Sequence, residues 1–201
     1  VAAPAMAVAQ PGVMSSEALG YLERGKLMYE SHNYVGAIDQ LEQMKRLPNN
    51  ASMLEQADYY IALSKFERGE ESSLDALLQF IDRYPASPLA VEAQLKVGNY
   101  YFYRGQWESA LLSYSLVRNR SLDIDSDEDL LYRRAYSNLR LGNYREAEHQ
   151  YYELEKSPRY GGATDFYKAY IEYAQGQYDA AEEHFARIPQ GREWGYQSRN
   201  Y

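Results

Sequence analysis

Side chains that could carry out acid–base or metal chemistry are few in this chain and lie far apart in the sequence. The three histidines are His32, His149 and His184, and there is no cysteine. Two of the histidines follow a glutamate, in Glu148-His149 and Glu183-His184. A zinc site needs three or four ligands that converge on one point, and two such pairs do not supply them. The lack of cysteine excludes disulfides, thiolate metal sites and a cysteine nucleophile.

The acidic residues do not form a catalytic or calcium-binding motif either. Asp123, Asp125 and Asp127 alternate as in a calcium loop, but the central glycine and the terminal glutamate of such a loop are missing. The sequence contains no glycine-rich phosphate loop, nucleophile elbow or zinc-protease motif. We therefore predict that the protein is not an enzyme, and that it has no catalytic residue, no metal site and no cofactor.

Tyrosine is the residue type whose number stands out, with 22 tyrosines in 201 residues. A tyrosine side chain has a large apolar body and a polar tip, so it suits interfaces that are partly exposed to water. The formal net charge of −8 argues against a nucleic-acid partner and against an anionic membrane surface. The sequence also has no apolar run long enough for a transmembrane segment. This composition favours a protein or peptide partner.

The elements that must position these rings are predicted to be helices. Apolar residues recur with helical spacing between regular glycine and proline breaks, and no alternating strand pattern occurs. The short breaks favour antiparallel helix pairs. The expected pairs are 16–31 with 34–46, 53–68 with 72–84, 88–104 with 107–119, 127–141 with 144–156, and 163–175 with 178–188.

One residue position recurs in the same setting in each of these pairs, about 36 residues apart. An alanine occupies it in four copies, usually after a Gly-x-Tyr or Gly-x-Trp signal. Such a period is typical of a stacked array of helix pairs, which offers an extended surface and no built-in reaction centre. The recurring residues are Ala37, Leu74, Ala110, Ala147 and Ala181.

The pattern resembles the tetratricopeptide repeat. Its eighth positions are Gly25, Ala62, Gly98, Ala135 and Ala169, and its fifteenth positions are His32, Gly69, Gly105, Gly142 and Gly176. The second copy is the poorest, with Glu71, Leu74, Leu78 and Ile81 at the later positions. The resemblance implies an all-α fold, a right-handed α-solenoid of about five antiparallel helix pairs over residues 16–189. Small residues at the eighth and twentieth positions are expected where the two helices of a pair touch.

A narrower resemblance, one repeat long, concerns Tyr84-Pro85-Ala86-Ser87-Pro88 and the alanines that follow it. This phrase resembles bacterial cell-envelope members of the family, among them the coordinator that works with the Tol–Pal system and the lipoprotein of the outer-membrane barrel assembly machine. The resemblance implies a location in the cell envelope.

The first residues agree with export. Residues 1–10 are small and apolar and contain two A-x-A patterns, as at the end of a secretory signal peptide cleaved after Ala9. The alternative is a flexible alanine-rich leader. We expect three parts: a leader at 1–15 that is a remnant of a signal, the solenoid at 16–189, and a tail or the start of a further repeat at 190–201.

The resemblance also implies a partner-binding groove, because certain first-helix positions of the family face a concave surface. Arg133 and Arg140, which lie in the same expected helix as the predicted groove residues Tyr132 and Tyr136, are expected to orient an acidic or C-terminal group of the partner. The alternative is that the aromatic rings at these positions only pack between helices. The groove residues are predicted to be Tyr59, Phe66, Asn99, Phe102, Tyr132, Arg133, Tyr136, Phe166, Tyr170 and Tyr173.

We therefore expect a non-enzymatic scaffold of the bacterial cell envelope, periplasmic or otherwise secreted across the inner membrane, that binds a protein or peptide in an aromatic-lined groove. The alternative is an N-terminal docking or sensor segment of a longer multi-repeat protein. Further repeats or a second copy of the chain are expected to contact the C-terminal end. An enzyme or a glycan-binding protein is the third and least favoured class, since no catalytic constellation exists.

Overall fold

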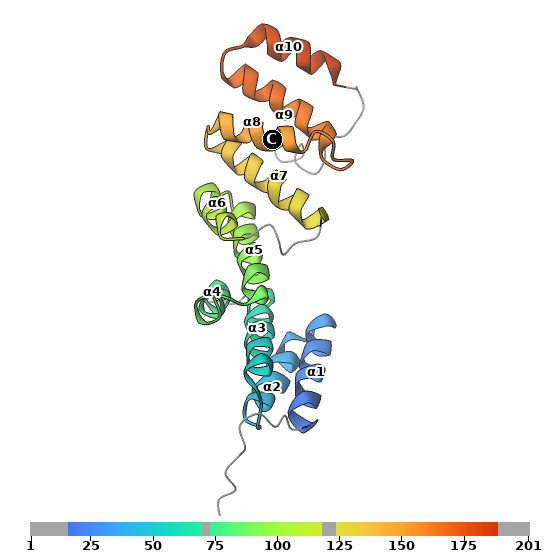
Figure 1. The fold of residues 1–201 in the computed structure, drawn as a ribbon, viewed down its shortest axis with the longest axis vertical. Coiled ribbons are helices and arrows are strands. Elements are labelled where there is room, and N and C mark those ends of the chain that lie inside the picture. The colour runs from blue at the N-terminus through green and yellow to red at the C-terminus, as the bar shows by residue number, and fades with distance from the viewer. Residues whose placement is uncertain (1–15, 70–72, 118–123, 189–201) are drawn as a thin grey trace, which may run out of the picture. The chain divides into compact units, whose positions relative to one another are not determined.

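The computed structural model describes residues 16–69, 73–117 and 124–188, without the side chains of 124–126 and 187. In these ranges the chain forms ten α-helices and no strand, which confirms the expected all-α fold of consecutive helix pairs (Figure 1). The expected leader and tail lie outside the described residues. The pairs are α1 (Ser16–Glu30) with α2 (Tyr34–Lys45), α3 (Ala51–Glu67) with α4 (Ser73–Arg83), α5 (Pro88–Tyr103) with α6 (Trp107–Ser115), α7 (Ile124–Arg140) with α8 (Tyr144–Glu153), and α9 (Gly161–Ala174) with α10 (Tyr178–Arg187).

The chain divides into two compact units, Val1–Val97 and Gly98–Tyr201, and the division falls within α5. We call them unit 1 and unit 2. None of the helices in the described ranges is long and apolar enough to cross a membrane. A core cluster of unit 1 joins α1, α2 and α3 through Ala18, Leu22, Leu41, Met44, Met53, Ala57 and Ile61. A core cluster of unit 2 joins α7, α8 and α9 through Ala135, Leu139, Ala147, Tyr151, Leu154 and Ile171.

A residue with positive φ ends the first helix of each pair. In four pairs it is a glycine, with φ between 68° at Gly69 and 80° at Gly176. The first pair has His32 instead, with a φ of 62°. A side chain in this left-handed region is strained, and glycine is not. The fifteenth position of the repeat is therefore a structural turn in every copy, including the one that lacks glycine.

Small residues lie where the two helices of a pair touch, as predicted. Ala37, Ala110, Ala147 and Ala181 are all buried. At the eighth position, a methyl group added to Gly98 would collide with the ring of Tyr114 on the facing helix. This contact leaves no room for a residue larger than glycine at position 98 of α5.

The second copy differs from its expected register. Leu74 and Leu78 were predicted to point inward on the second helix, yet Leu78 is exposed and Leu74 only partly buried. The buried residues of α4 are Ser73, Leu77 and Phe80. Their spacing repeats that of Ala37, Leu41 and Met44 on α2, with a small residue first. The register of α4 is thus one residue earlier than predicted, and Ser73 takes the place assigned to Leu74.

An acidic residue on the first helix of a pair holds the loop that follows the second helix. In unit 1, Asp58 accepts hydrogen bonds from the Tyr84 hydroxyl at 2.7 Å and from Arg83 at 2.9 Å. Ser87, at the end of the same loop, donates to Glu55 and caps the next helix by accepting from the backbone N–H of Leu89 at 3.0 Å. These contacts fix where the next helix begins.

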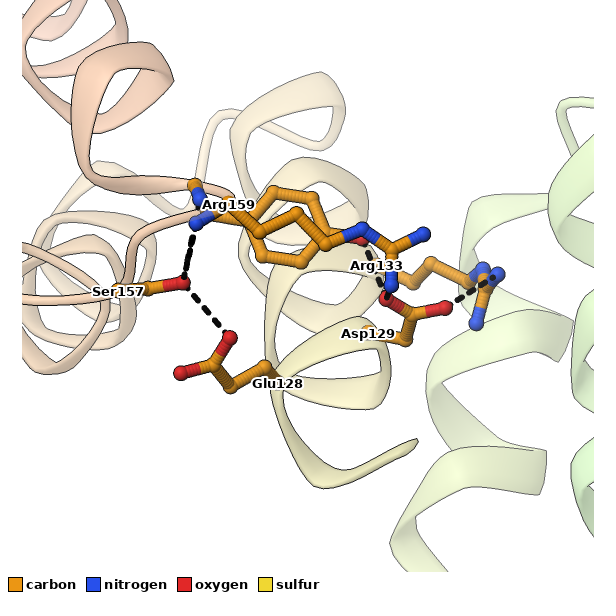
Figure 2. A network of polar contacts seen from close by, with 6 residues as sticks. Glu128, Asp129, Arg133, Ser157 and Arg159 are labelled. Carbon is orange, nitrogen blue, oxygen red and sulfur yellow. Dashed lines mark hydrogen bonds and ion pairs between the residues drawn. The ribbon is translucent and has the colours of Figure 1, made fainter. Parts of the chain in front are cut away.

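Unit 2 repeats the arrangement with different residues. Asp129 on α7 lies between Arg133 and Arg159 (Figure 2), forms an ion pair with each, and accepts from the Tyr160 hydroxyl. Ser157 donates to Glu128 at 2.7 Å and accepts from the backbone N–H of Tyr160 at 3.1 Å. The loop between α8 and α9 is therefore held in the same way as the loop between α4 and α5.

Candidate functional site

Several of the predicted groove residues belong to a packed tyrosine cluster in unit 2. The ring of Tyr132 stacks on Tyr160 at 4.5 Å between centroids, and Tyr151 stacks on Tyr167 at 4.9 Å. The hydroxyl groups of Tyr132 and Tyr167 lie 3.2 Å apart and share a hydrogen bond. Offset stacking of this kind stabilises a pair beyond the burial of its area. Tyr132 therefore packs α7 against its neighbours.

Phe102 and Tyr136, two further predicted groove residues, are buried as well. Both rings meet the indole of Trp107 edge-on, at 5.5 Å from centroid to centroid in each case. Phe102 and Tyr136 also contact each other at 5.7 Å. The rings of Phe102 and Tyr136 therefore pack between helices, as the alternative interpretation of the sequence expected.

In unit 1, Tyr59 is buried and Phe66 is partly buried. The Tyr59 hydroxyl donates to Glu92 on α5 at 2.8 Å. Burial, together with this hydrogen bond and the nearby Glu92 charge, raises the pKa of Tyr59 above its usual range. The structure therefore places Tyr59 within the packing of unit 1 and not on an open surface.

The two polar residues of the predicted groove have partners inside the protein. Asn99 accepts a hydrogen bond from the Tyr114 hydroxyl at 2.8 Å. Arg133 is mostly buried, lies 3.5 Å from Asp129, and shares a side-chain hydrogen bond with Tyr103. Both side chains are thus tied to neighbouring helices.

Two predicted groove residues remain open to solvent, on the last turns of α9. Tyr170 is 45% exposed and Tyr173 is 57% exposed. Tyr178, at the start of α10, is 63% exposed and meets the Tyr173 ring edge-on at 5.4 Å. The third predicted residue of α9, Phe166, is partly buried and contacts Phe185 at 5.7 Å. Tyr178 was not among the predicted groove residues, because it begins the second helix of its pair and the groove was expected on first helices.

An arginine of α7 completes this region. Arg140 is exposed, lies over the rings of Trp107 at 5.2 Å and Tyr136 at 5.9 Å, and donates to the Tyr136 hydroxyl at 3.1 Å. Tyr170 is close enough to Tyr136 to raise its pKa, after the larger effect of burial. We call Arg140, Tyr170, Tyr173 and Tyr178 the exposed aromatic surface. It combines apolar ring area with one cation, and this combination can bind apolar and acidic side chains of a peptide.

The histidines and acidic residues do not gather into a site. Across the described residues, no group of three or more His, Asp or Glu side chains could hold a metal ion. His184 Nδ1 lies 2.7 Å from Glu172, and His149 Nδ1 lies 3.5 Å from Glu153. His32 is the turn residue with positive φ. Each histidine is therefore in a local contact or turn of its own.

Comparison with known proteins agrees with this architecture. Residues 56–87 match the family model of the tetratricopeptide repeat. No protein of curated function matches the sequence at a significant level. Among solved structures, MamA of strain AMB-1 is 14% identical, with 90% of this chain and 95% of that chain covered and a TM-score of 0.65.

Two further structures show the same likeness. MamA of Desulfovibrio magneticus RS-1 is 13% identical, with 88% of this chain and 95% of that chain covered and a TM-score of 0.63. The C-terminal part of a TPR repeat-containing protein of Cytophaga hutchinsonii is 17% identical, with 85% and 66% covered and a TM-score of 0.63. Identities this low establish the fold alone. Residues 56–87 thus match the tetratricopeptide repeat, and the described helix pairs share the fold of a solved structure that contains such repeats.

Proposed function

We propose that the protein is a non-enzymatic scaffold of the bacterial cell envelope that binds a protein or peptide partner on the exposed aromatic surface of unit 2. The observation that carries this proposal is the exposure of Tyr170 and Tyr173. Most other aromatic side chains of the predicted groove are packed against neighbouring helices, whereas these two rings are open to solvent. Large exposed apolar groups that lie together commonly mark an interaction site.

The composition of the surface indicates which partner segment it suits. Tyrosine rings have few rotatable bonds, so they bind apolar side chains at a low cost in conformational entropy. A proline-rich or extended segment is the best match, because its backbone is already ordered before binding. The guanidinium group of Arg140 would pair with a carboxylate of that segment. Aromatic contacts dominate this surface, so we expect binding to depend only weakly on salt.

The envelope location is supported by the sequence. The two A-x-A patterns of residues 1–10 are typical of an exported chain. The Tyr84-Pro85-Ala86-Ser87-Pro88 phrase resembles envelope members of the family. Fractionation of cells that express the complete gene, with a periplasmic and a cytoplasmic marker protein, tests the location. Recovery with the cytoplasmic marker would contradict it.

Site-specific photo-crosslinking tests the binding surface. A photoreactive phenylalanine analogue is placed at Tyr173, on the exposed aromatic surface, and as a matched control at Tyr152, which is 66% exposed on α8. We expect Tyr173 to crosslink a defined envelope protein that Tyr152 does not. The partner, once identified by mass spectrometry and purified, should bind the double variant Tyr170→Ala, Tyr173→Ala at least about tenfold more weakly. Equal crosslinking from both positions would contradict the proposal.

One observation favours the alternative, a segment of a longer multi-repeat protein. Leu41, Leu77, Tyr114 and Tyr151 are corresponding second-helix residues of the first four pairs and are fully buried. Phe185, their counterpart on α10, is 37% exposed. A buried position that is open in the last pair is what a further repeat, or a second copy, would cover. The test compares this chain with a longer one that includes any residues encoded downstream. Light scattering gives the oligomeric state of each, and chemical denaturation gives its stability. A chain that is monomeric in both forms, with the same stability, contradicts the alternative.

A further inference from the structure

A second surface feature lies wholly within unit 1, apart from the residues of the exposed aromatic surface. It is a pocket of about 250 Å³ formed by α2, α3 and α4. Both α2 and α4 pack against α3, and all three helices contribute residues to the lining. Residues of the pocket follow helical spacing: Ile61 and Lys65 share one face of α3, and Phe80 and Arg83 share one face of α4. The helix register therefore builds the pocket.

The pocket is lined by both apolar and charged side chains. Ile61 and Phe80 belong to the apolar part of the lining and are almost fully buried. The charged lining consists of Lys45, Lys65 and Arg83 against Glu42 and Asp58. Three cations thus meet two carboxylates, in a chain whose formal net charge is −8. The local excess of positive charge is opposite in sign to that of the whole protein.

The carboxylate of Asp58 already has three partners inside the protein. Asp58 receives Lys45 Nζ at 2.9 Å, Arg83 at 2.9 Å and the Tyr84 hydroxyl at 2.7 Å. Asp58 is therefore neutralised from inside the protein. Lys45 also pairs with Glu42 at 3.6 Å, so one of the three N–H donors of its ammonium group is left, whereas Arg83 keeps several of the five donors of its guanidinium group.

Lys65 differs from the other two cations of the pocket, because it pairs with no carboxylate among the described residues. Within the described residues, its side chain forms no ion pair or hydrogen bond, although it lines the same pocket as Glu42 and Asp58. Lys65 is partly buried, and a lysine in such a place can lay its aliphatic stem on apolar surface while its ammonium group reaches water. A carboxylate brought to this place would meet Lys65 and the remaining donors of Lys45 and Arg83.

The size of the pocket decides between kinds of ligand. Pockets that enclose a small molecule or cofactor measure roughly 300–1,000 Å³. The volume of about 250 Å³ lies below that range, so it fits one protruding side chain better than a whole ligand. We propose that this pocket receives the glutamate or aspartate side chain of a partner protein, which pairs with Lys65 and with the remaining N–H donors of Lys45 and Arg83.

Peptide titration of the full chain, followed by nuclear magnetic resonance of its backbone amides, tests the proposal. The probes are acetylated and amidated Leu-Glu-Leu and, as a neutral match of the same size, Leu-Gln-Leu. We expect Leu-Glu-Leu to shift the resonances of backbone amides of α3 and α4 that line the pocket. The same concentration of Leu-Gln-Leu should not shift them. Lys65→Gln should weaken the Leu-Glu-Leu response about fivefold or more, the effect of one lost charge-assisted contact.

Lys26→Gln is the matched control, because it removes the same charge from α1 of the same unit, where Lys26 pairs with Glu23 outside the pocket. It should leave the midpoint unchanged. Equal weakening by both variants would mean that only the net charge matters and would overturn the proposal. Equal responses to the two peptides would also overturn it. So would inorganic phosphate, if it shifts the same amides at the same midpoint concentration as Leu-Glu-Leu.

Discussion

The hydroxyl group of Tyr160 donates a hydrogen bond to Asp129, a residue of the preceding first helix that lies 31 positions earlier in the chain. Tyr84 and Asp58 form the same contact in unit 1, across 26 positions and at 2.7 Å. In both places an arginine directly before the tyrosine pairs with the same carboxylate. The aspartate of one helix pair thus sets the path of the chain into the next pair.

The first prediction concerns the charge of Asp129. Asp129→Asn keeps the size of the side chain but removes the ion pairs with Arg133 and Arg159. We expect the free energy of unfolding to fall by about 1.5–3 kcal/mol, the range for hydrogen bonds to a charged group. Chemical denaturation measures it. Asp165→Asn, an exposed control on α9, should change it by less than about 0.5 kcal/mol. Equal effects of the two substitutions would contradict the role given to Asp129.

The same contact predicts a loss of stability in alkali. Burial, and then the hydrogen bond to Asp129, raise the pKa of Tyr160 from 10 to about 12. The raised pKa means that the folded protein holds this proton more tightly than the unfolded chain. The contribution is therefore complete below pH 10 and is lost as the pH rises towards about 12. Tyr160→Phe should flatten the fall in unfolding free energy between these two values; an unchanged slope would contradict the assignment.

Gly98 predicts a steric limit between α5 and α6. Gly98→Ala would drive a methyl group into the ring of Tyr114, so we expect overpacking to cost about 1–3 kcal/mol despite the better helix propensity of alanine. Thermal unfolding followed by circular dichroism measures it. Gly20→Ala is the control, since a methyl group there meets only the end of the flexible Arg24 side chain. The prediction fails if both variants melt at the same temperature.

His32 predicts a stabilising substitution. It holds the position that glycine holds in the other four pairs, with a φ of 62°. His32→Gly removes the left-handed strain of about 1–2 kcal/mol but adds freedom to the unfolded chain. We expect a net gain of about 0.5–1 kcal/mol by chemical denaturation. The reverse change, Gly142→His, should destabilise by a similar amount, and a stabilising Gly142→His would refute this explanation.

Much of the fold could be predicted from the sequence, because each repeat carries several independent signals. The turn glycines and the small residues at Ala110 and Ala147 fixed the ends and the register of their helices. The second pair had the weakest signals, and its second helix was placed one residue late. Ser73 and Leu74 are adjacent, and only the burial of Leu77 and Phe80 shows which face turns inward.

The candidate site was harder to predict, for a physical reason. An aromatic ring at a helical position provides the same pattern whether it faces solvent or a neighbouring helix. Tyr136 and Tyr170 occupy the same position of successive copies, yet Tyr136 meets Trp107 and is buried, whereas Tyr170 is 45% exposed. This difference in exposure depends on residues of other helices, so the spacing of aromatic residues in the sequence cannot predict it.

The final prediction compares two buried tyrosines that occupy the same repeat position. Tyr114 and Tyr151 are both fully buried, but the Tyr114 hydroxyl donates to Asn99 at 2.8 Å, whereas the Tyr151 hydroxyl has no hydrogen-bond partner among the described residues. A buried hydroxyl without a partner costs about 1–3 kcal/mol. Tyr151→Phe should therefore raise the unfolding free energy by about 1 kcal/mol, since it removes that cost and keeps the ring stacked on Tyr167. Tyr114→Phe should lower it by about 1 kcal/mol, because Asn99 loses its donor. Chemical denaturation of both variants tests the pair; destabilisation by Tyr151→Phe would mean that its hydroxyl is satisfied, by a bound water for example.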